Sequence, residues 1–320
     1  MDKRGFCTPR KESSSEVLTR KVIGGISFVL IPRGKFLMGS RQDDPQAFDN
    51  ERPQHILDIS YDYWIGRFPV TNEQFATFVH AESHRTTAET EGYGRIWSLE
   101  MKQWVKISGA DWRHPTGPKS DIDGIGDHPV VQVSWFDALA YCRWSNRLYG
   151  RELPHGLAFC LPGENEWEKA ARGEKGNVWP WGDEWQSRRC NSLEAGPGFT
   201  TPAGAYSPDG DSPYGAANMA GNVWEWTRSL WGPNADIPAF KYPYDRSDGR
   251  ENPDAALDIL RVLRGGSFGD DEARYVRCAY RDRLVPDFSY DYLGFRVAVA
   301  PSYRADSVTP HGDFQRTRKE

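Results

Sequence analysis

The residues with the clearest potential for chemistry lie between Leu263 and Val297. Fixed elements occur at both ends and in the middle of this segment: Arg264-Gly265-Gly266-Ser267, Arg277, Arg281, Pro286-Asp287 and Gly294-Phe295-Arg296. Gly and Pro set backbone turns, and guanidinium groups make several directed hydrogen bonds, so these residues are expected to form a rigid frame. The residues between them are rich in Tyr, Asp, Ser and Gly and follow no helical or strand period. Binding loops have this composition, because Tyr offers a large contact area at low entropic cost.

We therefore predict a ligand-binding surface within residues 268–292. Its expected contact residues are Gly269, Asp270, Asp271, Tyr275, Tyr280, Asp282, Leu284, Val285, Phe288, Tyr290, Asp291 and Tyr292. Aromatic faces beside carboxylates favour a protein or peptide ligand, with carbohydrate as the alternative, and a few aromatic anchors would supply most of the affinity. The competing interpretation is that Tyr275, Tyr280 and Phe288 pack into the core.

Other residues could hold a metal ion. His80 and His84 have the i,i+4 spacing that places two ligands on one helical face, but no third ligand is evident nearby. The chain has five cysteines, an odd number, and no CxxC or Cys/His spacing, which argues against a structural zinc site. Between Asn218 and Glu225, Asn and Glu oxygens combine with loop carbonyls in a set suited to Ca²⁺.

Composition excludes several classes of function. The net charge of −5 argues against nucleic-acid binding, which requires a basic field. The apolar run Val22–Ile31 is too short to span a membrane and lacks a small-residue cleavage site, so it is interpreted as the first strand. We expect a cytoplasmic protein without a membrane partner, and we expect the thiols to be reduced.

The elements that must position these residues are few. Strands are predicted at Ile26–Ile31 and Lys35–Met38, as a hairpin around Pro32-Arg33-Gly34, and within Gln54–Trp64. Helices are predicted at Asn72–His80 with Thr71 as cap, at Ser134–Leu148 with a buried stripe of Ala138, Tyr141, Cys142 and Ser145, and at Gly163–Arg172 ended by Gly173. Residues Trp179–Ser229 contain few regular elements, and short strands return at Val262–Arg264 and Phe295–Val299. The pattern predicts an α+β, coil-rich fold rather than alternating βαβ units.

A series of motifs identifies a resemblance. In order they are IPRGKFLMGS (31–40), ERPQH (51–55), YWIGRFPVTNEQFATFV (63–79), HPVVQVSWFDALAYCRWSN (128–146), LPGENEWEKAARG (161–173), WPWGDEW (179–185), YGAANMAGNVWEWT (214–227), VLRGGSF (262–268) and LGFRVA (293–298). Together they resemble the formylglycine-generating-enzyme-like (FGE-sulfatase, or sulfatase-modifying-factor) domain family. The resemblance implies a variant of the C-type lectin fold with short antiparallel strands and a few helices. The expected organisation is a flexible leader (1–20), one domain (21–300) and a flexible tail (301–320).

The family contains copper-dependent oxidases, iron-dependent sulfoxide synthases, inactive paralogues and ligand-binding proteins diversified by retroelements. In the oxidases two copper-binding thiols lie shortly after the RGGS motif, and the matching positions here hold Asp270 and Tyr275. Cys278 is close by but alone, so neither copper nor formylglycine-generating activity is expected. The resemblance also implies a structural Ca²⁺ site at Asn218, the Gly221 and Val223 carbonyls and Glu225. A second would start at Asn191 and the Ser192 carbonyl, although GPGF (196–199) lacks the acidic ligand expected there.

In the diversified members, adenines in a template are altered within the variable segment, so Asn codons can give Gly, Asp, Tyr, Leu, Val, Phe and Ser, among others, but never Lys, Glu, Gln, Met or Trp. The residues that lie between the frame positions in 268–292 fit this substitution pattern, with Glu272 as an exception. We predict a non-catalytic ligand-binding protein that is diversified in this way. The alternatives are an oxidoreductase with atypical metal ligands, drawn from His80, His84 and His128 or from Cys278, and an accessory subunit of an enzyme partner.

Overall fold

The computed structural model describes residues 18–98 and 100–301, so nearly all of the predicted leader and tail lies outside the described residues. The fold is α+β, as predicted, with the helices α1 (Asn72–Glu82), α2 (Thr87–Glu91), α3 (Trp135–Tyr149) and α4 (Glu164–Arg172). Its strands are β1 (Arg20–Ile23), β2 (Ile26–Ile31), β3 (Gly34–Met38), β4 (His55–Ile59), β5 (Tyr63–Gly66), β6 (Tyr93–Ser98), β7 (Gln103–Ser108), β8 (Leu157–Cys160), β9 (Trp224–Gly232), β10 (Leu260–Arg264), β11 (Asp282–Leu284), β12 (Leu293–Phe295) and β13 (Ala298–Pro301). Short 3₁₀ turns occupy Asp49–Glu51, Gly150–Glu152, Ser187–Arg189 and Ala273–Val276.

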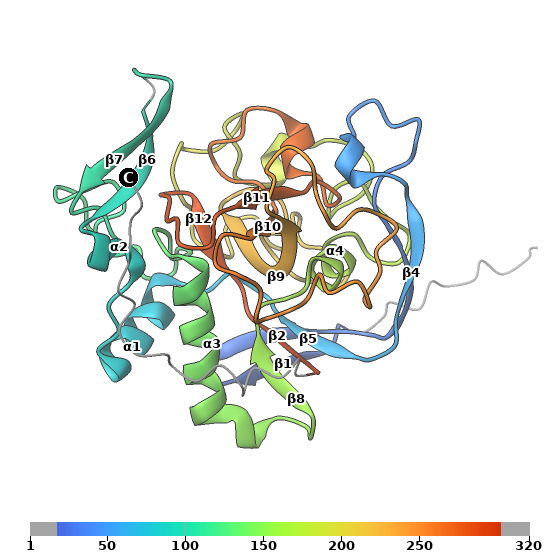
Figure 1. Ribbon diagram of the computed structural model, residues 1–320, viewed down its shortest axis with the longest axis horizontal. Coiled ribbons are helices and arrows are strands. Elements are labelled where there is room, and N and C mark those ends of the chain that lie inside the picture. The colour runs from blue at the N-terminus through green and yellow to red at the C-terminus, as the bar shows by residue number, and fades with distance from the viewer. Residues whose placement is uncertain (1–17, 99, 302–320) are drawn as a thin grey trace, which may run out of the picture.

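Two sheets organise the domain. The first has the order β1-β2-β5-β13-β8 and is antiparallel throughout. The second has the order β11-β10-β9-β12, in which β12 runs parallel to β9. In Figure 1 the second sheet lies at the centre of the molecule, the first lies below it, and the β6–β7 hairpin projects at the left. The second sheet carries both ends of the segment that the sequence selects as a binding surface.

The predicted hairpin of Ile26–Ile31 with Lys35–Met38 is wrong in its pairing. Both strands form, but β2 pairs with β1 and β5, whereas β3 pairs with β4. The turn that joins β1 to β2 is Gly24-Gly25, with φ of 57° and 77°, a conformation that favours glycine. The single strand expected at Val22–Ile31 is therefore split at these two glycines. The β6–β7 hairpin was not predicted.

The helix predictions are confirmed. Thr71 and Ser134 cap α1 and α3, each accepting a hydrogen bond from the third helical residue, and Gly173 ends α4. Ala138, Tyr141, Cys142 and Ser145 on α3 are buried as expected. No helix in the described ranges is long and apolar enough to cross a membrane.

Four arginines from the predicted frame are completely buried and paired with glutamates. Arg281 binds Glu164 through two hydrogen bonds of 2.7 and 2.8 Å. The other pairs are Arg264 with Glu168, Arg277 with Glu51 and Arg296 with Glu225. We call Arg264, Arg277, Arg281 and Arg296 the arginine frame. Removing one partner from a buried pair costs about 3–5 kcal/mol, so these contacts fix the backbone at four points along the segment.

Candidate ligand-binding site

The predicted contact residues divide into three groups by burial. Gly269 and Asp271 are exposed, and Asp270, Tyr275, Asp282, Leu284, Val285, Phe288, Asp291 and Tyr292 are half-buried. Tyr280 and Tyr290 are 9 % and 6 % exposed and belong to the main hydrophobic core. Their prediction as surface contact residues is therefore wrong, because both rings pack among other aromatic side chains instead of projecting into solvent.

The second sheet brings the central residues of the site together. Asp282 begins β11 and pairs with Leu263 of β10, whereas Trp224 begins β9 and pairs with Leu293 of β12. The Trp224 N–H also donates to the Tyr292 carbonyl at 2.9 Å. Asp270 follows β10 in a tight turn, in which its Oδ2 accepts hydrogen bonds from the Ser267 N–H at 2.6 Å and the Ser267 hydroxyl at 2.9 Å. Residues distant in sequence thus meet at one end of this sheet.

The two positions at which the oxidases resembling this chain carry copper-binding thiols hold a carboxylate, Asp270, and a phenol ring, Tyr275. Asp270 is held in its turn by Ser267, and the Tyr275 hydroxyl accepts a hydrogen bond from Arg274. The nearby thiol of Cys278 is buried, and burial raises its pKa to about 12, which disfavours the thiolate that metal binding requires. The site therefore lacks the two thiolates of a Cu(I) centre among the residues that follow RGGS.

Three carboxylates near this end of the second sheet have raised pKa values, so the fold disfavours their charged forms. Burial raises the pKa of Asp270 to about 6, and the charge of Asp282 adds to the shift. Burial also raises the pKa of Asp282, although Arg283 opposes that shift from 3.0 Å. Burial raises the pKa of Asp291 to about 7. No cationic side chain in the described ranges forms an ion pair with Asp270 or Asp291.

Aromatic rings surround these carboxylates and extend beyond residues 268–292. The Tyr280 ring lies 5.2 Å from Phe48, 5.3 Å from Tyr275 and 5.7 Å from Trp224. On the other side, Trp104 of β7 lies 4.7 Å from Tyr290 and 4.9 Å from Tyr292. Sequence reasoning missed Phe48, Trp104 and Trp224, because nothing local in the chain signals that they meet this segment.

The alternative histidine ligands do not assemble. Helix α1 ends at Glu82 and Ser83 adopts a left-handed φ of 50°, so His84 does not share a helical face with His80. His84 contacts Asp137 at 2.9 Å, while His128 contacts the Thr200 hydroxyl at 3.0 Å. Across residues 18–98 and 100–301, no group of three or more His, Cys, Asp or Glu side chains could hold a metal ion.

The predicted Ca²⁺ residues fit in part. Asn218 Oδ1 is buried without a hydrogen-bond partner, and Asn218 and Glu225 are linked through Arg296, which donates to both. Glu225 already accepts three hydrogen bonds, from Arg296 and Trp167, which leaves it one free lone pair. At the second position, a Cβ built on Gly196 would lie 2.0 Å from the unpaired Asn191 Oδ1 and 2.7 Å from the Ser192 carbonyl. Each position thus presents one unpartnered amide oxygen, Asn218 Oδ1 or Asn191 Oδ1, whereas Glu225 is already paired with the cationic Arg296. Ca²⁺ takes six to eight oxygen ligands, so these residues supply only part of such a set.

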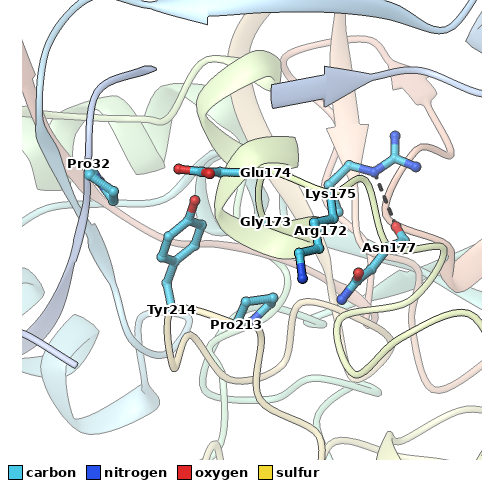
Figure 2. Close-up of a pocket in the computed structure, with 8 residues that line it drawn as sticks. All are labelled: Pro32, Arg172, Gly173, Glu174, Lys175, Asn177, Pro213 and Tyr214. Carbon is cyan, nitrogen blue, oxygen red and sulfur yellow. Dashed lines mark hydrogen bonds between the residues drawn. The ribbon is translucent and has the colours of Figure 1, made fainter. Parts of the chain in front are cut away.

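A separate pocket of about 540 Å³ lies where α4 ends (Figure 2). None of the predicted site residues lines it; its walls are formed by Pro32, Arg172, Gly173, Glu174, Lys175, Asn177, Pro213 and Tyr214. Arg172, the buried cation of this group, donates to the Gly39, Gly176 and Asn177 carbonyls and to Glu168. Its hydrogen bonds are therefore already used within the fold.

The few helices and short, mostly antiparallel strands joined by long loops make this a C-type-lectin-like fold. The chain belongs to the sulfatase-modifying factor enzyme 1-like (FGE-sulfatase) domain family, which it matches over residues 14–301. It is 38% identical over 306 residues to the formylglycine-generating enzyme of Thermomonospora curvata, covering 85% of this chain and 93% of that protein. It is 34% identical over 303 residues to the inactive Cα-formylglycine-generating enzyme 2 of Bos taurus, covering 85% and 88%.

Solved structures share the fold. PvdO from Pseudomonas aeruginosa matches with a TM-score of 0.63 and 21% identity, over 87% of this chain and 99% of that one. Variable protein 1 of Treponema denticola matches with a TM-score of 0.58 and 21% identity, over 89% and 99%. The predicted family and fold are confirmed.

Proposed function

We propose that this protein is a non-catalytic ligand-binding member of its family, and that residues 268–292 form its binding surface. The observation that carries the proposal is the replacement of the two copper-binding thiols by Asp270 and Tyr275. A linear Cu(I) site needs two soft sulfur ligands, and a carboxylate fixed by Ser267 cannot replace them. The remaining thiol, Cys278, is buried and strongly disfavoured as a thiolate.

The degree of sequence identity to the relatives does not show whether this chain has formylglycine-generating activity. The relatives named as active and as inactive formylglycine-generating enzymes are 38% and 34% identical to this chain, over nearly the same length. The choice therefore depends on the residues of the site rather than on the degree of relatedness.

The architecture supports a binding role. The arginine frame fixes the backbone of the segment through buried ion pairs, and the eight half-buried residues between its members include Tyr, Phe and Asp side chains that could contact a partner. We propose a protein or peptide ligand. We also propose that Ca²⁺ binds at Asn218 and Glu225 and at Asn191 and Ser192, where it would stabilise the loops rather than take part in chemistry.

Two assays test this function. The purified full chain, supplied with copper, is incubated with a cysteine-containing sulfatase peptide, and aldehyde formation is measured by mass spectrometry. No aldehyde is expected, and its catalytic formation would overturn the proposal. In parallel, a phage-displayed random peptide library is selected against the wild-type chain and against a variant carrying Asp271→Arg and Tyr292→Glu. Enrichment on the wild type alone supports the proposal, and failure of the wild type to enrich any peptide contradicts it.

The diversified interpretation has its own test. The residue types between the frame positions fit adenine-directed substitution of a template, and the frame residues would be its constant part. A neighbouring reverse transcriptase gene is expected, together with an imperfect copy of the DNA that encodes residues 263–297, differing at adenines alone. A locus without that copy would remove diversification and leave the binding role in place.

A further inference from the structure

The β6–β7 hairpin has an outer edge whose backbone hydrogen-bonding groups are unused. Its two strands form a sheet of their own, and among the described residues β7 pairs with β6 and with no other strand. Figure 1 shows this hairpin projecting from the side of the molecule. We infer that the free edge of β7 binds an extended, acidic peptide segment of a partner protein, which adds to the hairpin as a third strand. This surface lies outside residues 268–292, so the inference does not depend on the proposed function.

The hydrogen-bond pattern of the hairpin shows which backbone groups point outward. The Gly109 N–H donates to the Gly92 carbonyl at 2.9 Å, and the pairing continues from there along β6 and β7 without a register shift. In an antiparallel ladder, residues whose N–H and C=O face the partner strand alternate with residues whose N–H and C=O face away from it. The residues of β7 that face away from β6 are Trp104, Lys106 and Ser108.

The outer edge of β6 is covered, whereas that of β7 is open. The same alternation turns Arg95 of β6 outward, and its carbonyl accepts hydrogen bonds from the Asp291 N–H at 3.2 Å and from Gln132 Nε2 at 3.1 Å. The three outward residues of β7 have no such backbone partner within the part of the chain that the structure describes, and all three are exposed. A row of free donors and acceptors on an edge strand is the template on which an extended peptide adds a strand.

The charges of the hairpin favour an acidic occupant. Lys106 lies directly opposite Arg95 in the strand pair, and like charges in this position repel each other. Instead of carboxylates, both cations contact rings: Lys106 Nζ lies 4.2 Å from the Tyr93 centroid and the Arg95 guanidinium 3.8 Å from that of Phe288. Arg95 is 7 % exposed, and its Nη1 has no hydrogen-bond partner. A carboxylate opposite Lys106 on the added strand would offset this positive charge.

An exposed ring beside Lys106 favours an aromatic residue in the same peptide. Trp104 is 39 % exposed and shares a face of the hairpin with Lys106, since residues two apart on a strand point the same way. Its ring lies 5.0 Å from that of Trp97, which is 43 % exposed. Aromatic side chains facing each other across neighbouring strands stabilise their pairing. The expected motif is therefore an acidic residue and an aromatic residue two positions apart.

A second copy of this chain is a poorer occupant than an acidic peptide. Two β7 edges that pair antiparallel through all three outward residues would place Lys106 against Lys106 of the other copy. Lysine on an edge strand is a common protection against such self-association, because the two charges repel. The same lysine therefore selects for an acidic strand and against a basic one.

The test uses the full chain and the peptide acetyl-Thr-Tyr-Thr-Glu-Thr-Tyr-Thr-amide, titrated to millimolar concentration. Its palindromic order places Glu opposite Lys106 and a Tyr beside Trp104 in either strand direction. Hydrogen exchange is followed by NMR on isotope-labelled protein. The Val105 and Ile107 amides should be protected before the peptide is added. At saturation, exchange of the Trp104, Lys106 and Ser108 amides should slow by about fivefold or more.

Charge exchange tests the role of Lys106. The same peptide with Gln in place of Glu should bind about three- to fivefold more weakly. Lys106→Glu should weaken binding of the Glu peptide by at least as much, and it should strengthen binding of a peptide with Lys in place of Glu. This reciprocal change would assign the preference to the pair that the added strand forms with residue 106.

A matched pair of variants tests the backbone contact. Ser108→Pro removes one outward N–H and leaves the hydrogen bonds between β6 and β7 intact, so it should weaken the Glu peptide about fivefold. Ser108→Ala keeps that N–H and should bind within about twofold of the wild type. Protection of the Val105 and Ile107 amides in each variant verifies that the hairpin is folded.

Several outcomes would overturn the inference. They are unchanged exchange of the three outward amides, equal binding of the Glu, Gln and Lys peptides, and equal binding by Ser108→Pro and Ser108→Ala. Protection that appears without peptide and grows with protein concentration would identify a second copy as the occupant and would overturn it as well. The assays of the proposed function concern residues 268–292, so either conclusion can fail while the other stands.

Discussion

Replacing Asp270 by Asn should stabilise the folded protein at neutral pH. The carboxyl ionises near 3.8 in an unfolded chain and near 6 in the fold, because burial disfavours its charge. The folded state therefore holds this proton more tightly than the unfolded state does. Its contribution to stability is complete below about pH 4 and is lost as pH rises through about 6.

The size of the effect follows from the two pKa values. At about 1.4 kcal/mol for each pKa unit, the difference between 3.8 and about 6 corresponds to about 3 kcal/mol, which partial exposure of Asp270 reduces to about 1–2 kcal/mol. Both hydrogen bonds from Ser267 go to Oδ2, so an amide oxygen keeps them while the amide nitrogen replaces Oδ1. For a domain of this size, Tm at pH 7.5 should rise by about 2–8 °C.

Differential scanning calorimetry of wild type and Asp270→Asn between pH 4 and pH 8 tests this reasoning. The difference in Tm should be smallest at pH 4 and grow to a plateau above about pH 6. Asp271→Asn, which alters an exposed carboxylate, should change stability by less than about 0.5 kcal/mol. A lower Tm for Asp270→Asn at pH 7.5, or a difference in Tm that does not vary with pH, would show that the buried charge of Asp270 does not destabilise the fold.

Three further outcomes are expected. Glu164→Gln should lower the free energy of unfolding by about 3–5 kcal/mol, because it leaves the buried Arg281 without its anionic partner. Asp43→Asn removes one partner of an exposed ion pair and should lower it by less than about 1 kcal/mol. Urea unfolding measures both values. EDTA should lower the Tm of the wild type, because it removes a bound ion that stabilises the fold. Asn218→Gly keeps the left-handed φ of 55° but removes the side-chain oxygen, so it should weaken the response to EDTA. Identical melting curves with and without EDTA would argue against Ca²⁺. Cys278 should resist iodoacetamide at pH 8 in the folded protein and react after denaturation, as peptide mapping would report, and labelling of the native protein would contradict its burial.

Local signals predicted the helices and the frame. The caps Thr71 and Ser134 and the terminating Gly173 act within a few residues of the elements they define, so their effect is readable in the chain. The sequence indicated Arg264, Arg277, Arg281 and Arg296 as frame residues, but it did not predict that they are buried. Their partners Glu51, Glu164, Glu168 and Glu225 were not predicted as partners, because each pair joins residues 71 to 226 positions apart.

Strand pairing and ring packing could not be read in the same way. The β2 and β3 strands are adjacent and have suitable lengths, yet each finds a different partner, because pairing is decided by the whole sheet and not by the connecting turn. Tyr280 and Tyr292 have the same residue type, but one is buried and the other half-buried. Composition alone cannot distinguish them, since burial depends on Phe48 and Trp224 arriving from elsewhere.

The arginine frame would allow the residues between its members to differ without loss of the backbone conformation, as the proposed diversification requires. The carboxylate partners of the arginine frame lie on α4, on β9 and at Glu51, outside residues 268–292. Arg264 also donates hydrogen bonds into that segment, but it does so to the backbone carbonyls of Cys278 and Tyr280. The free energy that fixes the backbone therefore does not depend on the identity of Gly269, Asp271 or Tyr292. Under the proposed binding function, a residue between the members of the arginine frame could be selected for its contact with a ligand, and the buried ion pairs would offset a destabilising residue such as the one we predict at Asp270.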